Sequence, residues 1–290
     1  MKPTTITTAL FTIALPLAAA ACGGSTATTT VEPATTSTTA AVVERPSDVV
    51  DELVAIDGGR LHLRCSGSGD VTVLLVAGWD AGSDRWSAVE PSMDERSRVC
   101  AYDRFGTGTS DPPPVTQTFE SQAADLHALL DEAGEPGPYV VAGHSFGGAG
   151  AVTFASRYPD EVAGLVLVDA SPATWPATVC SVPAYEAGCA VMRDPALDAE
   201  RLDVFPAFEA VAAIGSLGDL PMTVVTTAHR TDPTLEPAEL ARLDSVWDEG
   251  VDRWAALSTS SRVVTVEDTG HDIHVERPQV VIDELERLLP

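Results

Sequence analysis

The segment VVAGHSFGGAGAV, Val140–Val152, joins a run of β-branched apolar residues to a run of small residues through a single serine flanked by glycines. The first run predicts a buried strand that ends at Gly143, and the second predicts a helix that begins near Phe146. A chain that reverses this sharply forces the residue at the apex, Ser145, into a strained backbone conformation. Glycine at 143 and 147 lets strand and helix approach closely enough to hold it there.

A serine at such an apex has an exposed hydroxyl at the N-terminus of a helix, above the carboxyl end of a strand. The pattern Gly143-His-Ser145-Phe-Gly147 is therefore interpreted as a nucleophile elbow. In this geometry the backbone N–H of Phe146 faces any oxyanion that forms at the serine. Ser145 is the candidate nucleophile.

The rest of the chain alternates between predicted strands and helices. Leu53–Cys65 predicts a hairpin around an Asp-Gly-Gly turn. Further strands, short and almost continuously apolar, are expected at Val71–Gly78, Arg98–Asp103, Pro138–Gly143, Gly164–Ala170, Met222–Thr227 and Arg262–Asp268. Helices are expected at Phe119–Glu132, Phe146–Tyr158, Pro237–Leu257 and Pro278–Leu289. Strands of this kind are typical of a parallel sheet buried on both faces, so the fold class is α/β with helices on both faces.

Residues 171–220 interrupt this alternation with prolines, aromatic residues and a cysteine pair. They are expected to form a small insertion, a cap over one end of the sheet, between the sixth and seventh strands.

Composition limits the partners of the domain. The 290 residues are 44% hydrophobic, enough for a buried core, and the formal net charge is −26. A field this negative repels nucleic acid and anionic lipid surfaces, so we expect neither as a partner.

Residues 1–21 have the features of a secretory signal, with Lys2 ahead of an apolar stretch too short to span a membrane. Cys22 follows in a context similar to bacterial lipoprotein signals, which predicts lipidation of Cys22 and export to the outer face of the cell membrane. An ordinary cleaved signal is the alternative. Residues 22–49, rich in Thr, Ala and Pro, predict a flexible linker, and residues 50–290 the folded domain.

Export permits disulfides, and four cysteines remain after Cys22. They allow three pairings. Cys180 with Cys189 is favoured because it closes a short local loop, and buried free thiols are the alternative.

Three further motifs accompany the elbow in order: VLLVAGWD at 73–80, YDRFGTGTSD at 102–111 and TGHDIHVERPQVVIDEL at 269–285. Together they make residues 50–290 resemble an α/β-hydrolase. The resemblance implies a central strand with an oxyanion loop, an Asp-Arg-x-Gly-x-Gly-x-Ser loop, and a catalytic-histidine loop before the last helix. It also implies that Cys65 pairs with Cys100, because the strands that carry them are neighbours in that family.

Catalytic roles follow from chemistry and from this resemblance. A serine needs a base, and His271 follows the last strand at the same sheet edge as Ser145; His274 is the competing candidate. The acid should lie between serine and histidine in the chain. Asp169 ends a strand, where haloalkane dehalogenases and some related hydrolases place their acid, whereas Asp232 lies in the loop where the family more often places it.

The second oxyanion donor is expected from the backbone N–H of Trp79, although Ala77-Gly78-Trp79 replaces the family's common His-Gly-x. Asp103 and Arg104 are interpreted as loop-fixing residues.

The expected activity is hydrolysis of a small acyl substrate, an ester, thioester or amide, without a metal or organic cofactor. Perhydrolase-like and iminopeptidase-like activities on the same scaffold, and a non-catalytic surface binding lipoprotein, are the alternatives. Serine at the apex disfavours dehalogenase or epoxide hydrolase chemistry, for which the family uses aspartate there.

Overall fold

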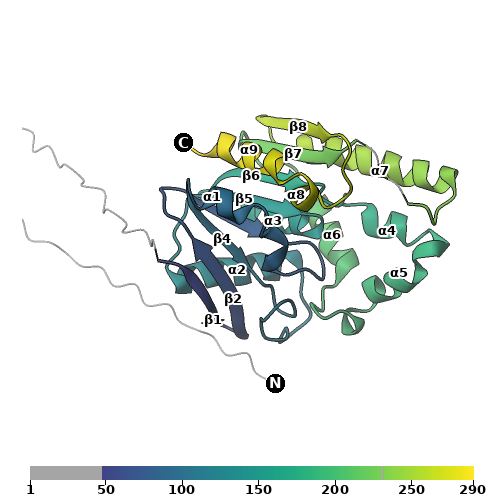
Figure 1. The fold of residues 1–290 in the computed structure, drawn as a ribbon. Helices are drawn as coiled ribbons and strands as arrows, with labels where there is room; N and C mark the ends of the chain where they lie inside the picture. Colours follow the sequence, from purple (N-terminus) through teal and green to yellow (C-terminus); the bar gives the residue numbers. More distant parts are fainter. Residues whose placement is uncertain (1–47, 229, 231) are drawn as a thin grey trace, which may run out of the picture. The chain divides into compact units, whose positions relative to one another are not determined.

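The computed structural model describes residues 48–228, 230 and 232–290, which form an α/β domain around one sheet (Figure 1). The sheet order is β1-β2-β4-β3-β5-β6-β7-β8. The strands of this region are β1 (Val50–Ile56), β2 (Gly59–Ser66), β3 (Thr72–Val76), β4 (Arg98–Tyr102), β5 (Tyr139–His144), β6 (Val162–Val168), β7 (Met222–Thr227) and β8 (Ser261–Val266). β1, β2 and β4 pair antiparallel, and the pairs from β4 through β8 are parallel. The expected α/β fold class is therefore confirmed.

Helices cover both faces of the sheet. The helical segments of the described chain are η1 (Ser83–Trp86), α1 (Glu90–Met93), α2 (Phe119–Ala133), α3 (Phe146–Arg157), α4 (Trp175–Val179), η2 (Pro183–Tyr185), α5 (Glu186–Arg193), η3 (Pro195–Leu197), α6 (Val204–Ala212), α7 (Pro237–Ala255), α8 (Ile273–Glu276) and α9 (Pro278–Leu288). Apolar residues of α2, α3, α6 and α7 pack into one core, and those of α1, α8 and α9 pack into a second core on the opposite face. Each core removes apolar surface from water, which is the main stabilising contribution.

Residues between β6 and β7 form α4, η2, α5, η3 and α6, where the sequence predicts the insertion. The insertion is anchored to the main core by Phe208, whose ring lies 4.7 Å from that of Phe146 and 5.1 Å from that of Phe119. A disulfide between Cys180 and Cys189 ties α4 to α5.

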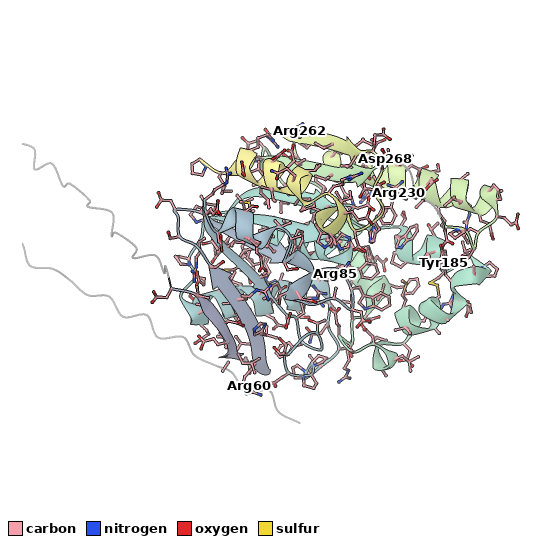
Figure 2. All side chains as sticks on the ribbon, in the orientation of Figure 1. Arg60, Arg85, Tyr185, Arg230, Arg262 and Asp268 are labelled. Carbon is pink, nitrogen blue, oxygen red and sulfur yellow. A yellow bond between two sulfur atoms is a disulfide. The ribbon has the colours of Figure 1, made fainter. Side chains whose placement is uncertain are left out.

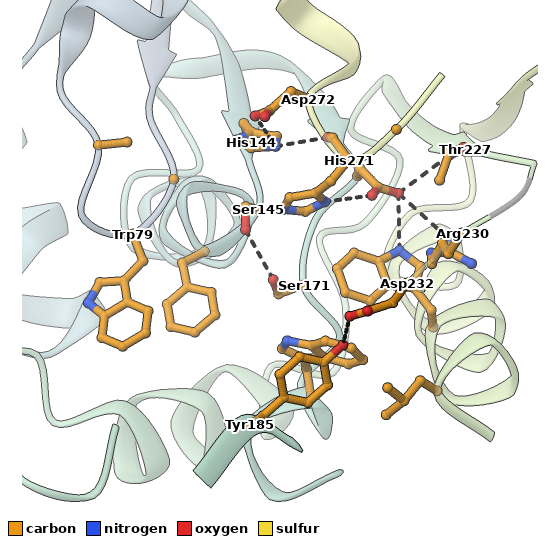
Figure 3. A pocket seen from close by; sticks show the side chains of 18 of the residues that line it. Trp79, His144, Ser145, Ser171, Tyr185, Thr227, Arg230, Asp232, His271 and Asp272 are labelled. Carbon is orange, nitrogen blue, oxygen red and sulfur yellow. Dashed lines mark hydrogen bonds and ion pairs between the residues drawn. The ribbon is translucent and has the colours of Figure 1, made fainter. Parts of the chain in front are cut away.

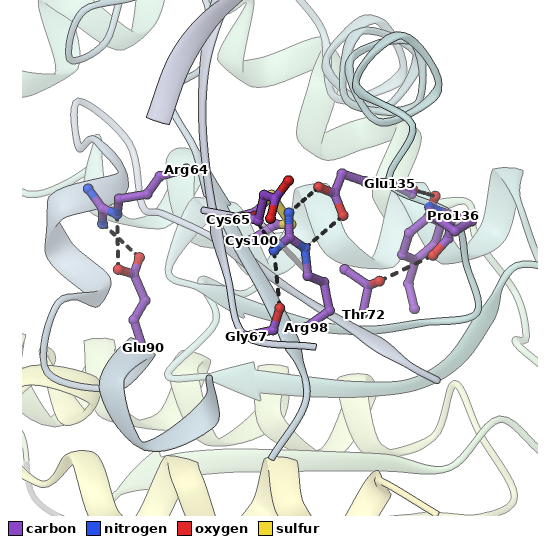
Figure 4. The surroundings of a disulfide bond; sticks show 11 residues. Arg64, Cys65, Gly67, Thr72, Glu90, Arg98, Cys100, Glu135 and Pro136 are labelled. Atoms are coloured by element: carbon purple, nitrogen blue, oxygen red, sulfur yellow. Dashed lines mark hydrogen bonds and ion pairs between the residues drawn. A yellow bond between two sulfur atoms is a disulfide. The ribbon is translucent and has the colours of Figure 1, made fainter. Parts of the chain in front are cut away.

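A second disulfide joins Cys65 on β2 to Cys100 on β4 (Figure 4). The two residues are direct partners in the antiparallel register of these strands. Both expected pairings are therefore present.

The expectation that every strand is buried on both faces is wrong for β8. This strand ends the sheet order, so a strand neighbour lies on one side only, and Arg262, Val263 and Thr265 are exposed. Figure 2 shows Arg262 at this outer edge. The apolar run of β8 therefore resembles that of a central strand, although β8 lies at the edge of the sheet and is partly exposed.

The predicted signal segment, Cys22 and the linker up to residue 47 lie outside the described residues, as does His229. Within the described ranges, none of the helices combines the length and the apolar character needed to cross a bilayer.

Candidate active site

Ser145 lies at the turn between β5 and α3 with φ 54° and ψ −124°, a strained conformation for a residue with a side chain. Its N–H donates to Val168 O on β6 at 3.1 Å, which fixes the apex against the sheet. A Cβ on Gly143 would lie 2.4 Å from Gly147 O, and one on Gly147 would lie 2.3 Å from Ala77 O. The glycines are therefore required by the close approach of α3 to β5 and to the end of β3.

The Ser145 side chain faces a cavity of about 570 Å³ between the carboxyl edge of the sheet and the insertion. Its Oγ lies 3.3 Å from Ser171 Oγ, and the Ser171 N–H donates to Ser145 O at 3.2 Å. His271 lines the same cavity, and Figure 3 shows its ring beside the Ser145 hydroxyl. The expected nucleophile and base are thus brought to one cavity from positions 126 residues apart in sequence.

The imidazole of His271 is held by Asp169. His271 Nδ1 lies 2.7 Å from Asp169 Oδ2, and the aspartate side chain is 1% exposed. The other oxygen, Oδ1, accepts hydrogen bonds from Thr226 Oγ1 at 3.0 Å and Trp247 Nε1 at 3.1 Å. A buried carboxylate needs this many partners, and they leave Oδ2 aimed at the histidine.

Asp232 lines the cavity, but its contacts differ from those of Asp169. It accepts hydrogen bonds from the Tyr185 hydroxyl and from the N–H and hydroxyl of Thr234. Thr234 and Tyr185 together lower the pKa of Asp232, while burial and this carboxylate raise the pKa of Tyr185 to about 12. Of the two candidate acids, Asp169 is therefore the one in contact with His271.

His144 lies between His271 and His274, in contact with both rings. The ring of His144 is 4.6 Å from that of His271 and 4.3 Å from that of His274. His144 Nε2 lies 3.1 Å from His271 O, a carbonyl that only accepts, so this nitrogen carries the proton. Burial lowers the pKa of His144 well below its usual value and that of His274 to about 4.

His274 is fully buried against Trp86, with ring centroids 4.5 Å apart, and neither of its ring nitrogens has a hydrogen-bond partner within the described region. It is therefore packed as a neutral core ring. Donor atoms of His144, Asp272 and His274 lie within 4.8 Å of one another, a spacing open to a metal ion. However, Arg85 already holds Asp272 Oδ1 at 2.8 Å.

On the other side of Ser145 lies the predicted oxyanion loop. The ring of Trp79 stacks on that of Phe146 at 5.3 Å, and a Cβ on Gly78 would lie only 3.2 Å from Ser145 Cβ. The loop backbone therefore approaches the serine closely. The Arg104 guanidinium donates to Gly78 O at 2.6 Å.

Asp103 fixes a different pair of loops, because its carboxylate accepts from the N–H groups of Ser83 and Thr109. Burial alone would raise the pKa of Asp103, but these hydrogen bonds lower it. Asp103 and Arg104 thus both fix loops, but through separate contacts.

Two residues of the site carried no usable sequence signal. Trp247 lies on α7, where it follows an ordinary helical periodicity, and Arg230 lies in the loop after β7. Arg230 Nη2 is 3.6 Å from Asp169 Oδ1, and its guanidinium carbon is 4.9 Å from the centre of the Trp247 ring. Apolar and aromatic side chains supply most of the remaining cavity wall: Trp79, Phe146, Trp175, Met192, Leu240 and Leu243.

Known proteins share this fold. A family model described as alpha/beta hydrolase fold matches residues 71–248. "Lipase LipV" from Mycobacterium tuberculosis is 40% identical over 110 residues, which are 38% of this chain and 41% of that protein. "Uncharacterized protein YqjL" from Bacillus subtilis is 24% identical over 234 residues, covering 80% of this chain and 89% of that protein. Carboxylesterase CesB (YbfK) from Bacillus subtilis superposes with a TM-score of 0.60 at 17% identity, over 84% of this chain and 92% of that chain.

The family model spans more than half of the chain, and the chain belongs to the α/β-hydrolase fold family.

Proposed function

We propose that this protein is a serine hydrolase that cleaves a carboxylic ester or related acyl substrate through an acyl-enzyme intermediate. Ser145 is the nucleophile, His271 the general base and Asp169 the acid that orients it. The 2.7 Å contact between His271 Nδ1 and Asp169 Oδ2, at the cavity that Ser145 enters, carries this proposal. Such a contact leaves Nε2 unprotonated and able to accept the serine proton.

In the first half-reaction, Ser145 Oγ attacks the substrate carbonyl carbon while His271 Nε2 accepts the hydroxyl proton. The backbone N–H groups of Phe146 and Trp79 stabilise the negative charge on the tetrahedral oxygen. The intermediate collapses as His271 returns the proton to the leaving alcohol, and the acyl group remains on Ser145.

In the second half-reaction, water attacks the acyl-enzyme carbonyl and gives its proton to His271. The second tetrahedral intermediate releases the carboxylic acid, and the proton returns to Ser145 Oγ. Asp169 stays ionised throughout and stabilises the imidazolium in each half-reaction.

The cavity supports a compact, largely apolar substrate. Its volume of about 570 Å³ lies within the usual range of small-molecule sites, and Trp79, Trp175, Leu240 and Leu243 contribute apolar wall. We therefore expect p-nitrophenyl esters of short and medium acyl chains to be hydrolysed faster than long-chain esters.

The direct test uses a fragment that starts at Val43 and therefore contains the predicted folded domain, with a p-nitrophenyl ester series and a fluorophosphonate probe. We expect hydrolysis and covalent labelling of the wild type, and loss of both in Ser145→Ala. Ser171→Ala is the matched control, because it removes the neighbouring hydroxyl and leaves the proposed nucleophile. Absence of labelling and hydrolysis in a folded wild type would favour a binding protein, and turnover of amino-acid amides or peroxide in place of esters would favour the iminopeptidase-like or perhydrolase-like alternatives.

We also propose that the enzyme is exported and anchored to the cell membrane through a lipid on Cys22. The signal-like residues 1–21 support this proposal, as do the two disulfides, which persist in oxidising compartments. The test is detergent-phase partitioning of the full chain expressed in a bacterium, with Cys22→Ala as the control. Equal partitioning of the two chains would contradict the lipid anchor.

A further inference from the structure

A buried ion pair links the insertion to the loop that follows β4. Arg104 Nε lies 2.7 Å from Glu200 Oε2, and Arg104 Nη2 lies 3.0 Å from Glu200 Oε1. The two side chains are 6% and 1% exposed. Glu200 lies between η3 and α6, almost one hundred residues after its partner, so the contact joins two distant parts of the chain.

Both partners also hold the predicted oxyanion loop. Arg104 Nη1 donates to Ala77 O at 2.7 Å and Nη2 donates to Gly78 O at 2.6 Å. Glu200 Oε1 accepts from the N–H of Asp80 at 2.7 Å. The loop is therefore fixed on both sides of residue 79.

The contact with Gly78 O has a specific consequence. The carbonyl of Gly78 and the N–H of Trp79 belong to one planar peptide group, so the direction of one sets the direction of the other. A guanidinium that holds this carbonyl thereby sets where the Trp79 N–H points. Asp80 has φ 54°, a conformation that a residue other than glycine keeps only when its surroundings hold it.

We infer that Glu200, supplied by the insertion, is a positioning residue for the oxyanion hole, acting through Arg104 and the N–H of Asp80. This inference rests on the proposed acyl-transfer function. Glu200 orients the guanidinium group of Arg104, and this group holds Gly78 O. The Glu200 carboxylate also holds the peptide N–H of Asp80. Packing supports the link, because a Cβ on Gly106 would lie 2.1 Å from Ala199 O, so the Arg104 loop and the insertion meet backbone to backbone.

The opposite end of β4 offers a matched control. Arg98, its first residue, forms a second buried pair with Glu135, with Nε 3.0 Å from Oε2 and exposures of 2% and 0% (Figure 4). Arg98 Nη1 also donates to backbone carbonyls, those of Asp48 and Gly67. The two pairs are thus alike in chemistry and burial, but only one of them reaches the oxyanion loop.

The experiment compares Glu200→Gln with Glu135→Gln in the same ester assay. We expect both variants to unfold at lower temperature, because each leaves a buried guanidinium unpaired. Only Glu200→Gln should lose kcat, by tenfold or more with KM changed less than about threefold, since a displaced donor acts on the transition state more than on bound ester. Affinity for a trifluoromethyl ketone, whose adduct with a serine carries an oxyanion, should fall by a similar factor in that variant alone.

Equal kcat values in the two variants would overturn the inference, as would a fall in kcat with unchanged trifluoromethyl ketone affinity. If Glu200→Gln does not fold, Glu200→Asp replaces it, because it keeps the charge and withdraws the carboxylate by one methylene; a wild-type kcat in that variant would also overturn the inference. Arg104→Lys keeps the positive charge but loses the planar guanidinium group that donates to several acceptors at once. It should lower kcat and trifluoromethyl ketone affinity as Glu200→Gln does. A wild type that hydrolyses no acyl substrate would instead refute the proposed function.

Discussion

His274 makes the domain sensitive to acid, and the size of the effect follows from its burial. The pKa of this residue falls from 6.5 to about 4 on folding because its ring is fully buried. Between these two values the unfolded chain binds a proton that the folded chain does not, so the free energy of unfolding decreases as pH falls. At 1.36 kcal/mol per pKa unit, the loss reaches about 3 kcal/mol by pH 4.

The substitution His274→Phe should remove this loss. Phenylalanine keeps an aromatic ring against Trp86 and His144, and no hydrogen bond is broken within the described region, because neither nitrogen of His274 has a partner there. For a domain of this size, 1 kcal/mol corresponds to about 2 °C in Tm. We therefore expect the Tm of the variant, relative to wild type, to rise by about 6 °C between pH 7 and pH 4.

Thermal unfolding followed by circular dichroism at several pH values measures this difference. His127→Phe is the control, because His127 is a half-exposed ring paired with Glu161 at the surface and should give no such gain. A Tm difference between His274→Phe and wild type that is independent of pH would refute the reasoning. Retained ester hydrolysis in the variant would also exclude His274 as the general base.

Three other outcomes follow from the geometry. Asp169→Asn should lower kcat by about 10³-fold or more by leaving His271 in the wrong tautomer, while Asp232→Asn should change kcat by less than tenfold; similar losses in steady-state assays would contradict the assignment. Gly147→Ala should destabilise the domain strongly or prevent folding, because its Cβ would lie 2.3 Å from a backbone oxygen, and a wild-type Tm would disprove this contact. Replacing Cys65 and Cys100 with alanine should lower the free energy of unfolding by up to about 4 kcal/mol for a crosslink spanning 35 residues, as measured by urea denaturation.

Local signals in the sequence were sufficient to predict the sheet, the sharp turn at Ser145 and the position of His271 at the edge of the sheet. A run of apolar residues that ends in Gly143-His-Ser145 restricts the backbone within a few residues, so strand, turn and helix can be predicted together. The position of His271 could also be predicted, because a histidine that follows the last strand must lie at the carboxyl edge of a parallel sheet. In each case one short segment contains the information.

The acid could not be decided in this way. Asp169 and Asp232 both follow strands at the same edge, and sequence cannot show which carboxylate meets the imidazole. The structure separates them through distant partners: Trp247 on α7 holds Asp169, and Tyr185 in the insertion holds Asp232. The role of Arg230 in the site could not be predicted for the same reason, because its partners are Asp169, which follows β6, and Trp247 on α7.

The contacts of the insertion also bear on how substrate reaches Ser145. Glu200 ties one end of the insertion to the oxyanion loop through a buried ion pair, and breaking such a pair typically costs 3–5 kcal/mol. Tyr185, within the Cys180–Cys189 disulfide loop, reaches the rest of the site through a part-buried side-chain hydrogen bond to Asp232, and no buried ion pair is seen there among the described residues. We therefore expect the cavity to open by local motion of α4 and α5, with residues 199–202 remaining in place. Hydrogen exchange should show faster exchange in residues 175–193 than in 199–202, and the opposite order would mean that the insertion moves as one rigid lid.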